Sequence, residues 1–300
     1  MHAHDHRHDH AHHHPEPSDK RYTIAIALNL GFVAVETAAG FLANSTALLS
    51  DATHNLSDVL GLALAGGAAW LAKQQASEQR TYGFSKATVL AALANALVLL
   101  IACGGILWEA VRRFYAPEPI EAGFVMAVAT VGVLINGATA MLFLAGRKED
   151  VNVRGAYLHM LADAGVSAAV IVAGAAIWFT GLDWIDPAIS IGVVALILWG
   201  TWGLLRESLD LTLDAAPAHI DVAEVRAFLA GQAGVTAVHD LHVWAMGAAK
   251  PALTAHLVRP EGGDDAFLAG VTDALAHRFG IRHVTLQVER AQRDECAECH

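Results

Sequence analysis

Six blocks of apolar residues, each long enough to span a membrane, dominate the first 206 residues of this chain. They run at about 22 to 43, 47 to 72, 87 to 114, 120 to 145, 153 to 180 and 184 to 206. Roughly 20 helical residues cross the ~30 Å hydrocarbon core of a bilayer. The chain is 55% hydrophobic with a mean hydropathy of +0.41, too apolar for an ordinary soluble domain. The fold class predicted is an α-helical polytopic membrane protein with six transmembrane helices.

The basic residues predict the orientation of these helices. By the positive-inside rule both termini are cytoplasmic, and we expect an integral protein of a bacterial inner membrane. The first 21 residues are polar and lack the apolar core of a signal peptide, so the first spanning segment serves as the insertion signal. On one side lie Lys20, Arg21, Lys73, Arg80, Lys86, Arg147, Lys148, Arg154 and Arg206, and on the other lie Arg112 and Arg113.

A small α+β domain is predicted after the membrane domain, which spans residues 22–208. Asp221 can cap a helix that ends near Gly231, and alternating patterns at 235 to 244 and 252 to 259 predict strands around a turn at Gly247. A second helix at about 264 to 279 and a strand at 283 to 289 follow. This αββαβ order, within residues 209–290, resembles metallochaperone-like domains with both helices on one face of the sheet.

The ends of the chain carry further metal-binding residue types. Residues 1–21 hold eight of the seventeen histidines and predict a disordered cytoplasmic arm that collects metal, a purification tag being the alternative. Cys296 and Cys299 in the tail 291–300 form a Cys-x-x-Cys pair that can chelate zinc or act as a redox pair. The net charge of -11 comes largely from the last third of the chain and gives no reason to expect nucleic acid as a partner.

Two His-x-x-x-Asp pairs within apolar segments are the candidate functional residues. Positions i and i+4 share a helix face, so His54 with Asp58, and His159 with Asp163, can each close on one ion. Ionisable groups in spanning helices are costly and usually face a cavity or a partner. Two nitrogens and two carboxylate oxygens in a tetrahedral array favour zinc or cobalt(II) over calcium and magnesium.

Other polar groups in these segments have structural explanations. Asp51 is expected to cap the second helix. Glu36 and Asn29 in the first helix either line a pathway or pack between helices.

The ligand chemistry suggests antiport as the mechanism. Neutral histidine binds metal, whereas protonated histidine does not, and two empty carboxylates in a low-dielectric site attract protons. If the site opens alternately to the two sides, a proton gradient expels the metal. One alternative is a membrane-tethered metal sensor or buffer, but this function leaves the buried ligands unexplained. The other is an intramembrane metalloenzyme, which would need an open coordination position for water and a general base, and these segments contain no His-Glu-x-x-His motif to supply that base.

The chain resembles the cation diffusion facilitator family, in particular its zinc-exporting branch, from Tyr22 to Glu289. The resemblance implies that the protein is a homodimer embedded in the lipid bilayer and exports zinc, with cobalt or cadmium as further substrates, in exchange for protons. It also implies that His54, Asp58, His159 and Asp163 are the transport ligands. Besides these pairs it rests on the motif from Ser45 to Asp58, on Tyr82-Gly83 with Lys86, on Asn95, Asn136, Trp184 and Asp186-Pro187, and on Val238 to Trp244.

Some positions depart from the family pattern. Thr88 stands where an acidic residue is common, and the loop from Lys73 to Tyr82 lacks the Asp and His residues of an additional site, so no metal is expected there. Relatives with Asp at the position of His54 accept cadmium more readily, so His54 indicates a preference for zinc.

The resemblance also suggests a regulatory zinc site in the C-terminal domain. His239, His256 and His283 occupy positions where related domains bind zinc, and Glu289 follows on the last strand. Gln287 replaces a histidine of some relatives, and His242 can point to either face. The Cys-x-x-Cys tail could complete this site, and Lys86 could pair with Asp210 or Asp214 as a mechanical link.

Overall fold

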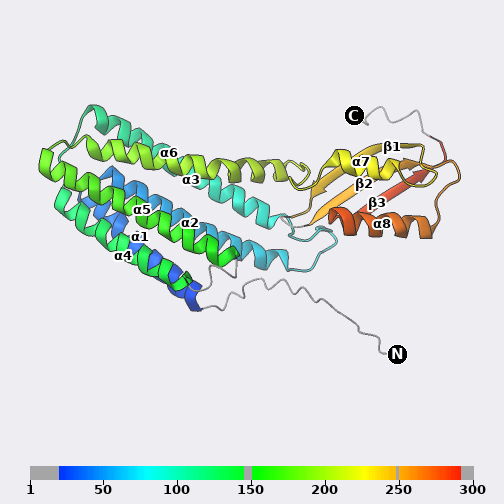
Figure 1. Ribbon diagram of the computed structural model, residues 1–300, viewed down its shortest axis with the longest axis horizontal. Helices are drawn as coiled ribbons and strands as arrows, with labels where there is room; N and C mark the ends of the chain where they lie inside the picture. Colours follow the sequence, from blue (N-terminus) through cyan, green and yellow to red (C-terminus); the bar gives the residue numbers. More distant parts are fainter. Residues whose placement is uncertain (1–19, 145–150, 248–249, 292–300) are drawn as a thin grey trace. The chain divides into compact units, whose positions relative to one another are not determined.

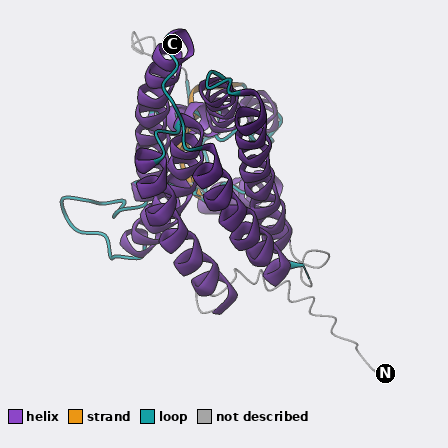
Figure 2. Ribbon diagram, turned by 90° about the vertical axis from the view of Figure 1, so that its left-hand side faces the viewer, coloured by secondary structure: helices purple, strands orange, loops and turns teal. Residues whose placement is uncertain are grey.

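The computed structural model describes residues 20–144, 151–247 and 250–291 (Figure 1). These residues contain six long helices, followed by two short helices and three strands. Most of the described chain is helical, as the purple ribbons of Figure 2 show. The long helices are α1 (Lys20–Leu42), α2 (Thr46–Ala72), α3 (Ala87–Tyr115), α4 (Ala122–Phe143), α5 (Val151–Thr180) and α6 (Ile185–Thr212).

The long helices have the dimensions of membrane spans. Five of them, α2 to α6, are long and apolar enough to cross a bilayer, and α1 contributes a shorter apolar stretch, Ile26–Leu42. The prediction of a helical membrane protein with a C-terminal α+β domain is confirmed. The His-rich arm before residue 20 and the cysteine pair at 296 and 299 lie outside the described residues.

Two compact parts can be distinguished by their internal packing. The first is formed by the described residues of Met1–Val59 and Ala102–Leu196, and the second by those of Leu60–Ile101 and Ile197–His300. Helices α2, α3 and α6 contribute residues to both. Each part is described by itself below.

In the first part, α4 packs along α5 and also contacts α1. Its core is built from small and branched side chains, including Ala129 on α4 and Val170 on α5. A Cβ on Gly132 of α4 would lie 2.7 Å from the Phe32 ring of α1 and 2.9 Å from Ser167 Oγ of α5. Glycine therefore lets three helices meet closely, as small residues do in membrane proteins.

The start of α2 is held by Asp186, which lies on the first turn of α6. One Asp186 oxygen accepts from the Thr46 backbone N–H and from Thr46 Oγ1, both at 2.7 Å, and the other accepts from Ser45 Oγ at 2.5 Å. A carboxylate at a helix N-terminus satisfies free N–H groups and complements the helix dipole. The expectation that Asp51 caps α2 is wrong: Asp51 lies more than a turn inside the helix and accepts from Ser167 Oγ at 2.8 Å.

In the second part, an α+β domain follows α6. It consists of α7 (Val222–Ala230), β1 (Ala237–Ala245), β2 (Pro251–Val258), α8 (Asp265–Phe279) and β3 (His283–Glu289). Strand β2 lies between β1, which is antiparallel to it, and β3, which is parallel to it. Figure 1 shows the strands in orange to red. The predicted αββαβ order is confirmed, including Asp221 as the cap of α7, which accepts from the Ala223 N–H at 2.8 Å.

The core of this domain lies between the helices and one face of the sheet. Val225 and Leu229 of α7, Leu253 of β2, and Val271 and Leu275 of α8 are buried together. Because side chains alternate along a strand, the odd-numbered residues of β2 face this core and the even-numbered ones, including His256, face the other side. The second face of the sheet is therefore the one that carries the histidines.

The loop between α2 and α3 contacts the α+β domain within this same part. Lys86 Nζ lies 2.6 Å from Asp214 Oδ1, which confirms that Lys86 pairs with the connector and selects Asp214 as the partner. Asp210 instead lies 3.9 Å from Arg206 on its own helix. A Cβ on Gly247 would clash with the Ser85 carbonyl oxygen, so only glycine fits where the β1–β2 turn meets this loop.

Candidate metal centre

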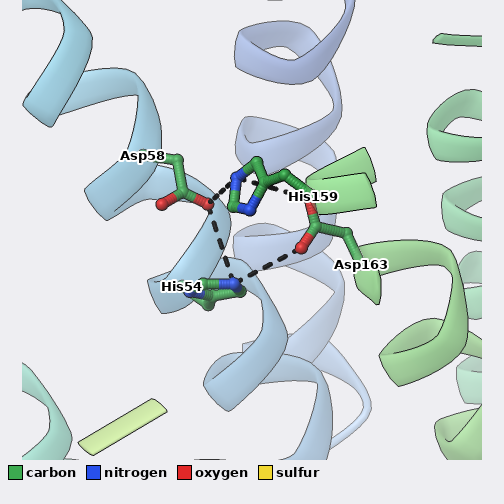
Figure 3. A group of neighbouring side chains, drawn as sticks. All are labelled: His54, Asp58, His159 and Asp163. Carbon is green, nitrogen blue, oxygen red and sulfur yellow. Dashed lines mark ion pairs between the residues drawn. The ribbon is translucent and has the colours of Figure 1, made fainter. Parts of the chain in front are cut away.

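Four side chains from two helices converge at one point in the first part. His54 and Asp58 project from α2, and His159 and Asp163 project from α5 to meet them (Figure 3). Each offers one ligand atom, and these atoms all lie within 4.8 Å of one another. The structure thus brings together all four residues predicted for the transport site.

The individual distances match a tetrahedral ion. His54 Nε2 lies 3.7 Å from Asp58 Oδ2 and 3.4 Å from Asp163 Oδ1. His159 Nε2 lies 3.2 Å from Asp58 Oδ2 and 3.7 Å from Asp163 Oδ2. Bonds of about 2.0–2.2 Å from a central ion set ligand atoms of a tetrahedron about 3.3–3.6 Å apart. The four N···O distances are therefore close to those in a tetrahedral zinc shell, with Asp163 facing each histidine through a different oxygen.

The carboxylates keep lone pairs available for an ion. Asp58 Oδ2 and Asp163 Oδ2 are buried and have no hydrogen-bond donor among the described residues. An unsatisfied buried oxygen is costly, and coordination of a cation removes that cost. The side chain of Asp163 is only 2% exposed, whereas that of His159 is 41% exposed, so the group is open on the His159 side.

Neighbouring residues of α1 and α6 hold α2 in this arrangement. The cap by Asp186 fixes the first turn of α2, and Ser50 Oγ lies 2.6 Å from Ser190 Oγ of α6. Asn55, which follows His54, donates to Glu36 of α1 at 3.2 Å. Sequence reasoning did not assign these roles, because the contacts join residues far apart in the chain and leave no local pattern.

A second group lies on the face of the C-terminal sheet that is turned away from α7 and α8. Ligand atoms of His239, His256 and Glu289 lie within 4.8 Å of one another. His239 Nε2 is 3.2 Å from Glu289 Oε2, and His256 Nδ1 is 3.4 Å from Glu289 Oε1. The strand register explains the cluster, since His239 pairs directly with His256, and Val258, two residues further along β2, pairs with Glu289.

His283 is not part of this group. It begins β3, six residues before Glu289, so it lies about 20 Å away along the strand. Its ring packs edge-on against Tyr82 with centroids 5.7 Å apart. His242 instead contacts Asp240 at 2.8 Å, where φ of 51° at Asp240 and a register shift mark a bulge in β1.

The acids of this face are ionised at neutral pH. The hydrogen bond with His242 holds the pKa of Asp240 below its usual value, and the charges of His256 and His239 add to the effect. Burial acts to raise the pKa of Glu289, but hydrogen bonds with Gln287 and His239 outweigh it, so the pKa is lowered. Glu289 is therefore present as the carboxylate that a metal requires.

The spanning helices and the group of two histidines and two aspartates on α2 and α5 indicate a membrane protein that binds a metal cation. Comparison with known proteins is consistent with this class. The model for the cation efflux transmembrane domain matches residues 22–211, and the model for the cytoplasmic domain of cation efflux proteins matches residues 217–291.

Similar proteins include characterised metal exporters. The metal cation efflux system protein CzcD of Cupriavidus metallidurans is 37% identical over 276 residues, covering 91% of this chain and 87% of that protein. The zinc transporter ZitB of Escherichia coli is 37% identical over 284 residues, covering 94% and 90%. A cadmium, cobalt and zinc/H(+)-K(+) antiporter of Bacillus subtilis is 33% identical over 272 residues, covering 89% and 87%.

Among solved structures, the metal-bound C-terminal domain of CzcD is 38% identical and covers 23% of this chain and 99% of that chain, with a TM-score of 0.21. The chain belongs to the cation diffusion facilitator family of cation efflux proteins. It is an integral membrane transporter and not an enzyme.

Proposed function

We propose that the protein exports zinc from the cytoplasm in exchange for protons, and that the ion passes through the group formed by His54, Asp58, His159 and Asp163. The observation that carries this proposal is the convergence of the four side chains: one ligand atom from each lies within 4.8 Å of the others, and the N···O distances of 3.2 to 3.7 Å suit a tetrahedral ion. The names of ZitB and the Bacillus antiporter support zinc as a substrate, with cobalt and cadmium as further ones.

Protons and metal compete for the same atoms. An imidazole nitrogen cannot bind zinc once it is protonated. A carboxylate that has lost its metal in apolar surroundings is stabilised by binding a proton. Alternate opening of one site to two sides then converts competition into antiport. The Bacillus relative is itself named as an antiporter that uses protons.

The exposure of the ligands supports a side from which zinc would enter. With both termini in the cytoplasm, α5 enters the membrane from the cytoplasmic side and α2 returns to it. The ligands nearer the cytoplasm, Asp58 and His159, are 31% and 41% exposed, whereas His54 and Asp163 are 22% and 2% exposed. We infer that zinc enters from the cytoplasmic side, where the two more exposed ligands lie.

The sheet group of His239, His256 and Glu289 is proposed as a regulatory zinc site. Three ligands leave one tetrahedral position open, and a residue of a second copy of the chain or a thiolate of Cys296 or Cys299 can complete it. Cys296 is seven residues from Glu289, within reach of an extended chain. Occupation of the site would join two protomers of a homodimer as cytoplasmic zinc rises.

The rival functions account for fewer of the contacts. A sensor or buffer needs only the C-terminal group and gives no role to the four ligands on α2 and α5. A metalloenzyme would keep an open position for water, yet four protein ligands already surround the transport site.

Transport in reconstituted vesicles tests the proposal. Full-length protein should move zinc along an imposed proton gradient, with protons moving the opposite way. Asp163→Ala should abolish this movement while zinc still binds the sheet group, and Asp183→Ala, outside both groups, serves as the control. Zinc uptake without counterflow of protons would contradict antiport, and normal transport by Asp163→Ala would contradict the assigned site.

A further inference from the structure

Two acidic side chains next to the metal ligands have no role in the mechanism so far. Glu36 of α1 and Asp51 of α2 are both 0% exposed, in a part of the molecule that the family places in the membrane. The donors that contact them are neutral: Asn55 Nδ2 donates to Glu36 Oε2 at 3.2 Å, and Ser167 Oγ donates to Asp51 Oδ2 at 2.8 Å. These hydrogen bonds use only one oxygen of each carboxyl group.

The remaining oxygen of each group lacks a donor. Glu36 Oε1 and Asp51 Oδ1 are buried with no hydrogen-bond partner among the described residues, although the two carboxyl groups lie within hydrogen-bonding reach of each other. Two adjacent carboxylates repel strongly in a medium of low dielectric constant. One proton on the pair removes a negative charge and supplies the missing O–H donor. It therefore relieves both the repulsion between the carboxylates and the lack of a hydrogen bond to the buried oxygens.

This pair is electrostatically close to the metal ligands without being one of them. Asp51 lies three residues before His54 on α2, and Ser167 lies one turn after Asp163 on α5. The charged groups that face the pair are Asp163 from α5 and His54 from α2. A dication bound between these residues adds two positive charges and weakens the hold on a proton nearby.

We propose that Glu36 and Asp51 form a proton-binding site, separate from the four metal ligands, that holds one proton without metal and releases it when a divalent cation binds. This inference rests on the proposed antiport and adds a second place where protons are carried. In the release step the O–H bond of the shared carboxyl group breaks, the electron pair stays on oxygen, and the proton passes to water. Both groups are then carboxylates, because the bound ion cancels the negative charges of Asp58 and Asp163 that favour a proton nearby.

The two side chains can be tested with substitutions of equal shape. In Glu36→Gln the amide N–H can donate to Asp51 and the amide oxygen can accept from Asn55, so the hydrogen bonds of the protonated acid are retained without a proton to release. Glu118→Gln is the matched control, because Glu118 is a partly exposed carboxyl group that accepts from Asn44 Nδ2 at 2.8 Å, away from the pair.

Infrared difference spectroscopy on the purified full-length protein measures the proton directly. The spectra are recorded with and without zinc at about pH 8, where an unperturbed histidine is neutral. We expect a C=O band of a protonated carboxyl group in the metal-free wild type that disappears when zinc is added. The band should be absent from Glu36→Gln and present in Glu118→Gln. In weakly buffered solution with a pH indicator, Glu36→Gln should release about one proton fewer per zinc ion.

Three results would overturn the inference: no such band in the wild type, an unchanged band in Glu36→Gln, or a band that zinc leaves unaltered. The wild-type measurement needs no variant, so a misfolded substitution does not decide the outcome. Because the spectra need no gradient, they are independent of transport. Antiport in vesicles combined with a zinc-insensitive band would leave the proposed function standing and remove only this site.

Discussion

At the scale of the residue, the identity of each ligand atom decides which ion the proposed transport site would accept. His54 supplies a nitrogen where a carboxylate would supply another oxygen and another negative charge. Imidazole nitrogen suits zinc in a tetrahedral shell, and the alternation of nitrogen and oxygen around the group keeps its charge balanced against a dication. The site therefore tolerates little change at this position without a change of preference.

Replacing His54 by Asp is expected to shift selectivity from zinc towards cadmium. The shorter aspartate side chain leaves more space for the larger cadmium ion. Its carboxylate, the third in the group, also replaces an imidazole nitrogen that zinc favours. The ratio of cadmium to zinc transport in vesicles should rise several-fold, with zinc transport falling. His283→Asp, which changes a histidine outside both metal groups, should leave the ratio unchanged. An unaltered ratio in His54→Asp would show that selectivity is decided elsewhere.

The ligands could be predicted from sequence because both pairs follow the i, i+4 spacing of a helix within apolar segments. The residues around them could not. The contacts of Asp51 and its neighbour Asn55 with Glu36 and Ser167 form only when α1, α2 and α5 pack together. The local sequence does not distinguish a buried serine that donates a hydrogen bond to an acid from one that only fills space. The resemblance groups His283 with His239 and His256, whereas the strand register separates it from them.

At the scale of the element, α2 depends on a residue of another helix for its first turn. Asp186 accepts hydrogen bonds from Ser45, Thr46 and the Ala47 N–H, and it is buried with them. An acidic residue at the start of α6 is most simply interpreted as a cap of its own helix, so the sequence predicted the helices correctly but not the bond between them. The spans themselves follow from hydropathy, which requires no knowledge of packing.

Asp186→Ala is expected to lower the free energy of unfolding by about 2 kcal/mol, because a cap is lost and buried hydroxyl groups are left unpaired. The loosened α2 should also weaken zinc binding, since His54 and Asp58 lie on the same helix. Thermal unfolding in detergent and zinc titration measure the two effects. Asp183→Ala, three residues earlier, is the control. Equal unfolding temperatures for both variants would refute the cap as a stabilising contact.

The pair of Lys86 and Asp214 is expected to matter for transport more than for stability. Its atoms are 2.6 Å apart, but the side chains are 40% and 56% exposed, and exposed pairs contribute only about 0–1 kcal/mol. Lys86→Glu should reduce zinc transport with little change in unfolding temperature, and the exchange Lys86→Glu with Asp214→Lys should restore it. Arg206→Glu tests a looser pair as a control. Wild-type transport by Lys86→Glu would remove the proposed mechanical link.

At the scale of the whole molecule, the described residues contain two groups of candidate metal ligands that differ in design. The membrane group has four ligands and needs nothing from elsewhere, whereas the sheet group has three and leaves a position for another residue. A complete shell suits an ion that must be carried, and an incomplete one suits an ion that joins a partner or a tail. This difference supports assigning transport to the first and regulation to the second.

The two groups should therefore be separable in the full-length protein. His256→Ala should bind about one zinc ion fewer per chain, because it removes one of three sheet ligands, while transport at saturating zinc persists through the intact membrane group. At low zinc its transport should lose the steep rise that a regulatory site gives. Equilibrium dialysis with metal analysis counts the ions, and vesicle uptake over a range of zinc concentrations measures the response.

His283→Ala is the matched control, since this histidine lies in the same domain but packs on Tyr82. If both variants bind the same amount of zinc as the wild type, the sheet group is not a metal site; if His283→Ala alone loses an ion, the regulatory zinc lies at the other end of the sheet.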